Sequence, residues 1–172
     1  YGAKKIINAT SDALKVLDNQ AYTDAIAQVA KKEGATVIIL SNNNTWKALA
    51  TRLSVRLKAG IGSGVSKLPV STNPFIVYKR AYSGNAYANV QIKSEIKILT
   101  LAQNSFEIIE SGAKSPIEDL ALSIDGSLVK TAVHDVQKQT GKILLTDAEV
   151  VVSGGRGMKS ADNWGYFRYN NT

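Results

Sequence analysis

The hydrophobic pattern of the first forty residues alternates between strands and a helix. Lys5–Ala9 is a short apolar run that predicts a strand, and Tyr22–Lys32 carries apolar residues at helical spacing before Gly34. Thr36–Leu40 is continuously hydrophobic, which is typical of a strand in a sheet covered on both faces. The order strand, helix, strand implies a parallel pair joined by a right-handed crossover.

A second helix is predicted over Thr45–Lys58, where apolar residues recur along one stripe. The stripe consists of Trp46, Leu49, Leu53 and Leu57, which we expect in the core. Arg52 and Arg56 lie one turn apart on another face, which predicts a solvated or interface surface. The polar loop Ser41–Thr45 suits a helix cap, and it follows a strand, where ligands gather in open α/β sheets.

The glycine-rich run Gly60–Gly64 follows this helix rather than a strand. A phosphate-binding loop needs the order strand, loop, helix, so we interpret the run as the turn that ends the helix. Val65–Val70 then predicts a short strand, which the turn at Ser71–Pro74 ends.

From Phe75 onward the pattern favours strands without intervening helices. Phe75–Tyr78 and Tyr87–Ile92 are strand-like runs separated by the turn residues Ser83–Asn85, so we expect them to pair antiparallel. Leu99–Leu101 is expected to return the chain to the parallel sheet. The tyrosines of this region (Tyr78, Tyr82 and Tyr87) are interpreted as packing residues rather than redox or catalytic ones.

The pattern after residue 110 is weaker. Ile117–Ile124 fits either a strand or a helix, Leu128–Val136 alternates and predicts a strand, and Gln137–Gly141 reads as a polar linker. The fold class predicted for the chain is α/β, a three-layer sandwich around a mainly parallel, Rossmann-like sheet with an antiparallel β-rich extension.

A glycine loop near the C-terminus is the strongest candidate for chemistry. Glu149–Ser153 predicts a buried strand, Gly154–Gly157 follows at once, and Ser160 can cap a helix. Glycines let backbone amides approach an anion, and a helix start adds partial positive charge. Arg156 adds a guanidinium that suits two phosphate oxygens or an electron-rich ring edge. The alternative interpretation is a tight turn with a surface arginine.

Composition removes several classes of function. The 172 residues include no cysteine, which excludes disulfides, thiol catalysis and Cys-ligated metals, and the single His134 cannot build a histidine metal cluster. No apolar run approaches the length of a membrane span. The net charge is +7, but the basic pairs lie in different elements and do not interleave with aromatics. This favours a solvated surface, or one facing an acidic partner, over nucleic-acid binding.

Three segments resemble one family. The segment TGKILLTDAEVVVSGGRGMKSADNW at Thr140–Trp164 closely resembles the junction between the two domains of the alpha subunit of electron-transfer flavoprotein. Lys79–Ala86 and Ile98–Phe106 resemble a tyrosine-glycine-asparagine stretch of that family and the strand after it. The resemblance implies a Rossmann-like fold and an FAD cofactor. It implies that Arg156 contacts the flavin, with Gly155 and Gly157 beside it.

The resemblance also implies a domain plan and a set of partners. It divides the chain into an amino-terminal α/β domain, residues 1–147, trimmed at its front, and the start of the FAD-binding domain, residues 148–172. The tail after Trp164 does not resemble the helix expected there, and this chain is not expected to hold FAD by itself.

The implied assembly is a heterodimer with a beta subunit that holds AMP. It is expected to carry electrons from flavoprotein dehydrogenases, such as acyl-CoA dehydrogenases, to a quinone reductase or similar acceptor. The resemblance implies no direct membrane insertion and a cytoplasmic location, or the mitochondrial matrix in a eukaryote. The alternative function is an adenine-nucleotide-binding α/β module of the universal-stress type, although the sequence has no Gly-x-x-Gly-x-Gly-Ser/Thr loop after a strand, and the nearest run, Gly60–Gly64, follows a helix.

Overall fold

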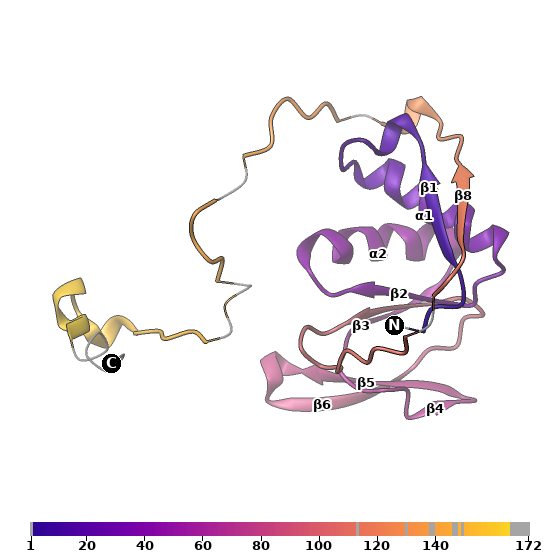
Figure 1. The fold of residues 1–172 in the computed structure, drawn as a ribbon. Coiled ribbons are helices and arrows are strands. Elements are labelled where there is room, and N and C mark those ends of the chain that lie inside the picture. The colour runs from indigo at the N-terminus through magenta and orange to yellow at the C-terminus, as the bar shows by residue number, and fades with distance from the viewer. Residues whose placement is uncertain are drawn as a thin grey trace. The chain divides into compact units, whose positions relative to one another are not determined.

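The computed structural model describes residues 2–112, 114–129, 131–137, 140–145, 148 and 150–165. The chain divides into two compact units, Tyr1–Ala132 and Val133–Thr172, which are considered separately. The first unit holds every α-helix and β-strand of the described residues (Figure 1). The predicted domain boundary at residue 147 stays a prediction.

The first unit is built on a six-stranded mixed sheet with the order β2-β7-β3-β5-β4 and β6 paired to β5. Strands β2, β7 and β3 run parallel, whereas β5 pairs antiparallel with β3, β4 and β6. The strand bounds are β2 Val37–Ser41, β3 Gly60–Val65, β4 Ser71–Thr72, β5 Phe75–Ala81, β6 Ala86–Gln91 and β7 Lys97–Leu101. The predicted α/β class with an antiparallel extension is confirmed.

Two α-helices, α1 (Asn19–Lys32) and α2 (Asn44–Leu57), are found among the described residues. The Asp18 carboxylate accepts hydrogen bonds from the amides of the first turn of α1, and the Asn43 side chain accepts one from the Trp46 amide in α2. These groups satisfy donors that no helical carbonyl can reach. The prediction that the loop before α2 supplies a helix cap is therefore confirmed.

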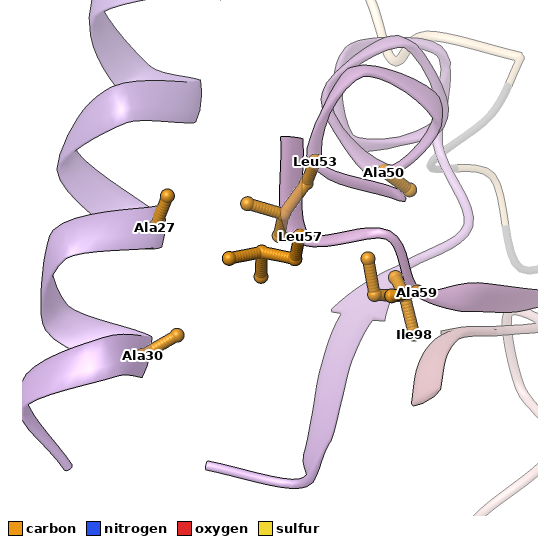
Figure 2. Packing of buried hydrophobic residues seen from close by; sticks show 7 residues of the cluster. All are labelled: Ala27, Ala30, Ala50, Leu53, Leu57, Ala59 and Ile98. Carbon is orange, nitrogen blue, oxygen red and sulfur yellow. The ribbon is translucent and has the colours of Figure 1, made fainter. Parts of the chain in front are cut away.

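The main core lies where α1, α2 and the sheet meet. It consists of Ala27, Ala30, Ala50, Leu53, Leu57, Ala59 and Ile98, drawn in Figure 2. Figure 2 shows the alanines of α1 turned toward the leucines of α2, so small side chains on one helix accept large ones on the other. Leu53 is fully buried, and burying such a side chain contributes roughly 1.5–3 kcal/mol.

Strand β1 (Ile6–Thr10) does not join the parallel sheet as predicted. It pairs parallel with β8 (Ile117–Ala121) in a separate two-stranded sheet, with Ile6 opposite Ile117 and Thr10 opposite Ala121. This pairing shows that the ambiguous segment Ile117–Ile124 contains a strand. Local sequence could predict that β1 is a strand but not its partner, which lies more than a hundred residues away.

The prediction that Thr36–Leu40 is covered on both faces is wrong. Strand β2 lies at the edge of the six-stranded sheet, and the side chains of Val37 and Ile39 are 39% and 57% exposed. Ile38, on the opposite face, packs against the main core. An apolar run therefore predicted the strand correctly but not its position in the sheet.

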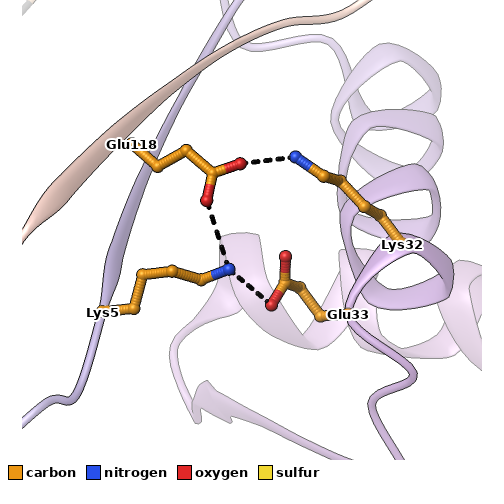
Figure 3. Close-up of polar contacts among 4 residues, drawn as sticks. All are labelled: Lys5, Lys32, Glu33 and Glu118. Carbon is orange, nitrogen blue, oxygen red and sulfur yellow. Dashed lines mark hydrogen bonds and ion pairs between the residues drawn. The ribbon is translucent and has the colours of Figure 1, made fainter.

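A charged cluster holds the β1–β8 sheet against the end of α1. The Lys5 ammonium lies 2.7 Å from the Glu33 carboxylate and 3.3 Å from that of Glu118, and Lys32 lies 2.6 Å from Glu118 (Figure 3). Hydrogen bonds from Lys32 and Lys5 lower the pKa of Glu118, and the hydrogen bond to Glu33 raises the pKa of Lys5. All four side chains are partly exposed, so water and salt screen the cluster.

The glycine run Gly60–Gly64 is a strand, not the turn predicted. The helix ends instead at Lys58, which adopts a left-handed conformation with φ of 51°, while the Ala59 amide donates to the Ser54 carbonyl. Within β3, a Cβ atom on Gly60 would lie 2.5 Å from Cγ2 of Ile92 and 2.7 Å from Oγ of Ser94. The glycine at this position allows the loop between β6 and β7, which carries Ile92 and Ser94, to pack closely on β3.

Two other strand predictions are corrected. Val65–Val70 holds only the last residue of β3, and residues 66–70 form no strand. Leu128–Val136 begins at the end of a 3-10 turn, Gly126–Leu128, and its described residues contain no strand. The side chains of Val133 and Val136 are both exposed. The alternation of apolar and polar residues in this segment therefore places no side chain in a core, and it does not specify a strand.

Candidate functional site

The glycine–arginine segment lies in the second unit and folds as two short 3-10 turns, Arg156–Met158 and Ala161–Trp164. The Met158 amide donates to the Gly155 carbonyl at 3.0 Å, and the Asn163 side chain donates to the Met158 carbonyl at 2.6 Å. The Ser160 hydroxyl accepts from the Asp162 amide at 3.3 Å and caps the second turn. The capping role predicted for Ser160 is confirmed, although the element is a 3-10 turn.

The glycines of this segment have two different surroundings. A Cβ atom on Gly154 would lie 2.8 Å from the Trp164 ring, so this glycine allows the indole to pack on the backbone. Gly155 and Gly157 face open space, with no atom within 4 Å of a built Cβ, and the Arg156 side chain between them is exposed. An anionic group therefore has room to approach both glycines and the guanidinium.

The residues present fit one edge of a flavin nucleotide. The positive charge of the guanidinium suits the negative pyrophosphate or the electron-rich edge of the ring. The two glycines beside it carry no side chain that would block the approach of either group. The described residues of the second unit are mostly exposed, and they supply no enclosed apolar walls for a flavin ring.

The valine-rich run before this segment is not the buried strand that the sequence predicts. Val150, Val151 and Val152 are 52–81% exposed and form no strand, and Glu149 lies outside the described residues. No strand occurs among the described residues of the second unit, so the run has no partner that could satisfy its backbone and cover its side chains. Residues 166–172 of the tail also lie outside the described part.

The carboxyl ends of the parallel strands meet at a partly buried polar cluster around Thr100. The Thr100 hydroxyl in β7 donates to the Asn42 side chain at 2.8 Å and accepts from the Gly64 amide at 3.0 Å. The Ser63 hydroxyl lies 3.3 Å from it. These groups hydrogen-bond to one another and so join the ends of three strands. No buried polar side-chain atom of this cluster is left without a partner for a ligand to meet.

One feature of the sequence indicates this cluster. Thr100 is the polar residue within the apolar strand Ile98–Leu101, and it is fully buried. A buried hydroxyl in a central strand needs partners, and the polar loop after β2 supplies one of them in Asn42.

Two of the cavities in the described part of the first unit lie beside its helices. One of about 670 Å³ is lined mainly by apolar residues of β1, α1 and β2, among them Ile7, Val29 and Ile39. The other, of about 570 Å³, lies along α1 and α2 and includes Arg52 and Arg56. Arg56 donates to the Asp24 carboxylate at 2.6 Å, so its charge is matched within the fold and ties the two helices together.

The described residues contain neither a metal site nor a membrane-spanning helix. No group of three His, Cys, Asp or Glu side chains is placed to hold a metal ion within the ranges given above. Across the same ranges, no helix is long and apolar enough to cross a membrane.

The first unit is an α/β domain built on a mixed, mostly parallel sheet. Comparison with known families narrows this class: residues 1–125 match the electron transfer flavoprotein domain. The chain belongs to that family. The resemblance seen in the sequence is thereby confirmed.

Individual relatives agree with the family assignment at low identity. The electron transfer flavoprotein subunit alpha of Bacillus subtilis (strain 168) is 26% identical over 167 residues, which cover 95% of this chain and 51% of that protein. The subunit of the same name from Syntrophomonas wolfei is 24% identical over 163 residues, and Protein FixB of Escherichia coli O127:H6 is 27% identical over 144 residues. These matches cover 94% and 83% of this chain, and 51% and 46% of the relatives. The chain thus spans about half the length of the curated relatives it matches.

Proposed function

We propose that this chain forms the amino-terminal part of the alpha subunit of an FAD-containing electron carrier. The carrier is a heterodimer with a beta subunit, which holds AMP. It accepts electrons from flavoprotein dehydrogenases, such as acyl-CoA dehydrogenases, and passes them to a quinone reductase or a similar acceptor. The family match over residues 1–125 and the subunit names of the relatives support this proposal.

The first unit has a structural role in this proposal. The polar groups at its strand ends hydrogen-bond to one another, and one of its two neighbouring arginines, Arg56, forms an ion pair with Asp24. The flavin supplies the redox chemistry when bound, and the protein supplies binding, orientation and charge. We place the carrier in the cytoplasm of a bacterium, or in the mitochondrial matrix if the source is eukaryotic.

Arg156 is the residue we assign to the flavin, with Gly155 and Gly157 on either side. The observation that carries this assignment is the exposed guanidinium between two glycines that face open space. A guanidinium there can hold the pyrophosphate or stabilise negative charge on the reduced ring. The described residues provide one edge of such a site, so the isolated chain is not expected to retain FAD.

No observation favours the alternative of an adenine-nucleotide module of the universal-stress type. Its phosphates would need open amides at the carboxyl end of a strand. The Gly64 amide at that position is already bonded to Thr100, and Gly60–Val65 is a packed strand.

The test uses the two-subunit protein with Arg156→Ala, Arg156→Lys and the control Lys159→Gln. A charge-assisted contact is worth about 1.5–3 kcal/mol, so Arg156→Ala should weaken FAD affinity roughly ten- to a hundredfold. It should also lower the flavin reduction potential. Arg156→Lys should rescue only part of the loss, because a point charge lacks the two-pronged geometry of the guanidinium.

Lys159→Gln removes an exposed cation three residues away and should leave both the flavin-to-protein ratio and the potential unchanged. In the 172-residue chain, Arg156→Ala should not shift the urea unfolding midpoint, because the side chain is exposed. An unchanged ratio together with an unchanged potential in the heterodimer would make Arg156 a surface residue in a glycine turn.

A further inference from the structure

The positive charge of the chain is concentrated in one stretch. Residues 34–94 contain no Asp or Glu and eight basic residues, which are Lys47, Arg52, Arg56, Lys58, Lys67, Lys79, Arg80 and Lys93. The other residues hold thirteen Lys and Arg against fourteen Asp and Glu, a net charge of −1. Of the eight, Arg56 is the one that forms an ion pair within the described part of the chain. This stretch includes α2 and the whole antiparallel extension.

The expectation that the basic pairs do not interleave with aromatics is wrong for Lys79 and Arg80, because part of this charge lies with aromatic rings on one face of the extension. Val77 is fully buried against the second core cluster, so the alternation along β5 directs Tyr78 and Arg80 to the opposite face. Tyr87 of β6 lies directly across from Arg80 in the antiparallel register. The extension lies at the opposite end of the sheet from β2 (Figure 1).

The two tyrosine rings on this face stack on each other, and a lysine lies over one of them. The Tyr78 and Tyr87 rings stack with centroids 5.0 Å apart and an angle of 17° between their planes. The Lys67 ammonium lies 4.7 Å from the centroid of the Tyr78 ring. Lys67, Tyr78, Arg80 and Tyr87, here named the Tyr–Arg face, thus form a pre-ordered surface in which Tyr87 is still 59% exposed.

We propose that the Tyr–Arg face docks an acidic surface of a protein partner. Tyr and Arg are the residue types that dominate binding energy at protein interfaces, and rings ordered in advance reduce the entropy lost on binding. An acid-free stretch attracts a negatively charged partner and speeds its association. Arg80 offers the planar donor geometry that carboxylates match.

The arrangement of the rings favours a protein over nucleic acid. Bases bind to such surfaces by stacking on open aromatic faces. Tyr78 is already engaged by Tyr87 and by Lys67, so it is not available to stack on a base. The surface is also remote in sequence from Arg156, and the proposal stands without the assignment of the flavin contact.

The test measures binding of the 172-residue chain to a fluorescent peptide of ten glutamates at low salt, by anisotropy. The Lys67→Gln/Arg80→Gln variant should weaken binding about fivefold, as expected for two exposed charge contacts. The matched control is Lys47→Gln/Arg52→Gln, which removes two exposed charges on α2 from the same acid-free stretch. The control should change affinity less than twofold. Thermal unfolding by circular dichroism checks that all proteins remain folded.

A second arm distinguishes the other polyanions. A ten-nucleotide single-stranded DNA and vesicles with anionic lipid should bind more weakly than the peptide, and Tyr87→Ala should weaken peptide binding beyond Tyr87→Phe. Equal losses in both charge variants would mean that bulk charge alone binds the peptide, and would overturn the proposal. Absence of peptide binding, or tighter binding of DNA that depends on Lys67 and Arg80, would overturn it as well.

Discussion

Gly60→Ala should destabilise the first unit strongly, because the glycine lies where the loop between β6 and β7 packs closely on β3. The new Cβ atom would meet Cγ2 of Ile92 at 2.5 Å and Oγ of Ser94 at 2.7 Å. That hydroxyl accepts from the Gly60 amide at 2.7 Å and donates to the Ile96 carbonyl at 2.6 Å, so displacing it breaks two hydrogen bonds. Overpacking costs about 1–3 kcal/mol and the lost bonds add to this, so we expect about 2–4 kcal/mol in all.

Urea unfolding followed by far-ultraviolet circular dichroism measures this change in the free energy of unfolding. The matched control is Gly126→Ala, at an exposed glycine with no atom within 4 Å of a built Cβ, and it should stay within about 0.5 kcal/mol of wild type. If the clash with Ile92 is the cause, Gly60→Ala/Ile92→Ala should cost less than the sum of the single changes. A Gly60→Ala variant as stable as the control would refute this account of β3.

Three further predictions concern other parts of the first unit. Thr100→Val keeps the shape of the side chain but leaves Asn42 and the Gly64 amide without their partner, so urea unfolding should show a loss of roughly 1–3 kcal/mol, and an unchanged stability would contradict the cluster. Ile39→Lys places a charge on the open edge strand β2, so light scattering at high concentration should show less self-association than wild type, and equal association would argue against this edge. The fold lowers the pKa of Glu118, so this carboxylate stabilises the folded state at pH values above the ordinary glutamate pKa of 4.5. That stabilisation is lost as the pH falls through the lowered pKa. Urea midpoints between pH 7 and 3 should therefore fall less steeply for Glu118→Gln than for wild type, and parallel curves would exclude a role for this cluster.

The parts of the fold that the sequence predicted well are those that local spacing decides. Leu49, Leu53 and Leu57 recur along one stripe and are buried in the structure, whereas Trp46, which was predicted to lie in the core with them, is partly exposed. The turn at Ser83–Asn85 lies between two β-prone runs, and β5 and β6 pair antiparallel across it. In both cases the residues that specify the element are neighbours in the sequence.

The parts that failed depend on neighbours distant in the sequence. Gly60–Gly64 looks like a turn until Ile92 and Ser94 are known to lie against it. Strand β1 pairs with β8, and no periodicity within either strand predicts that pairing. The flavin contact assigned to Arg156 stays a prediction, and the strand predicted before this residue gave no indication that its side chain is exposed.

The most direct measurement is the absorption spectrum and flavin content of the full-length protein purified together with its second subunit. Our account predicts a yellow heterodimer with a flavin band in the blue and one FAD for each pair of subunits. The 172-residue chain purified alone should be colourless. A colourless heterodimer that cannot be reconstituted with FAD would contradict the assignment of this chain to a flavin-carrying electron carrier.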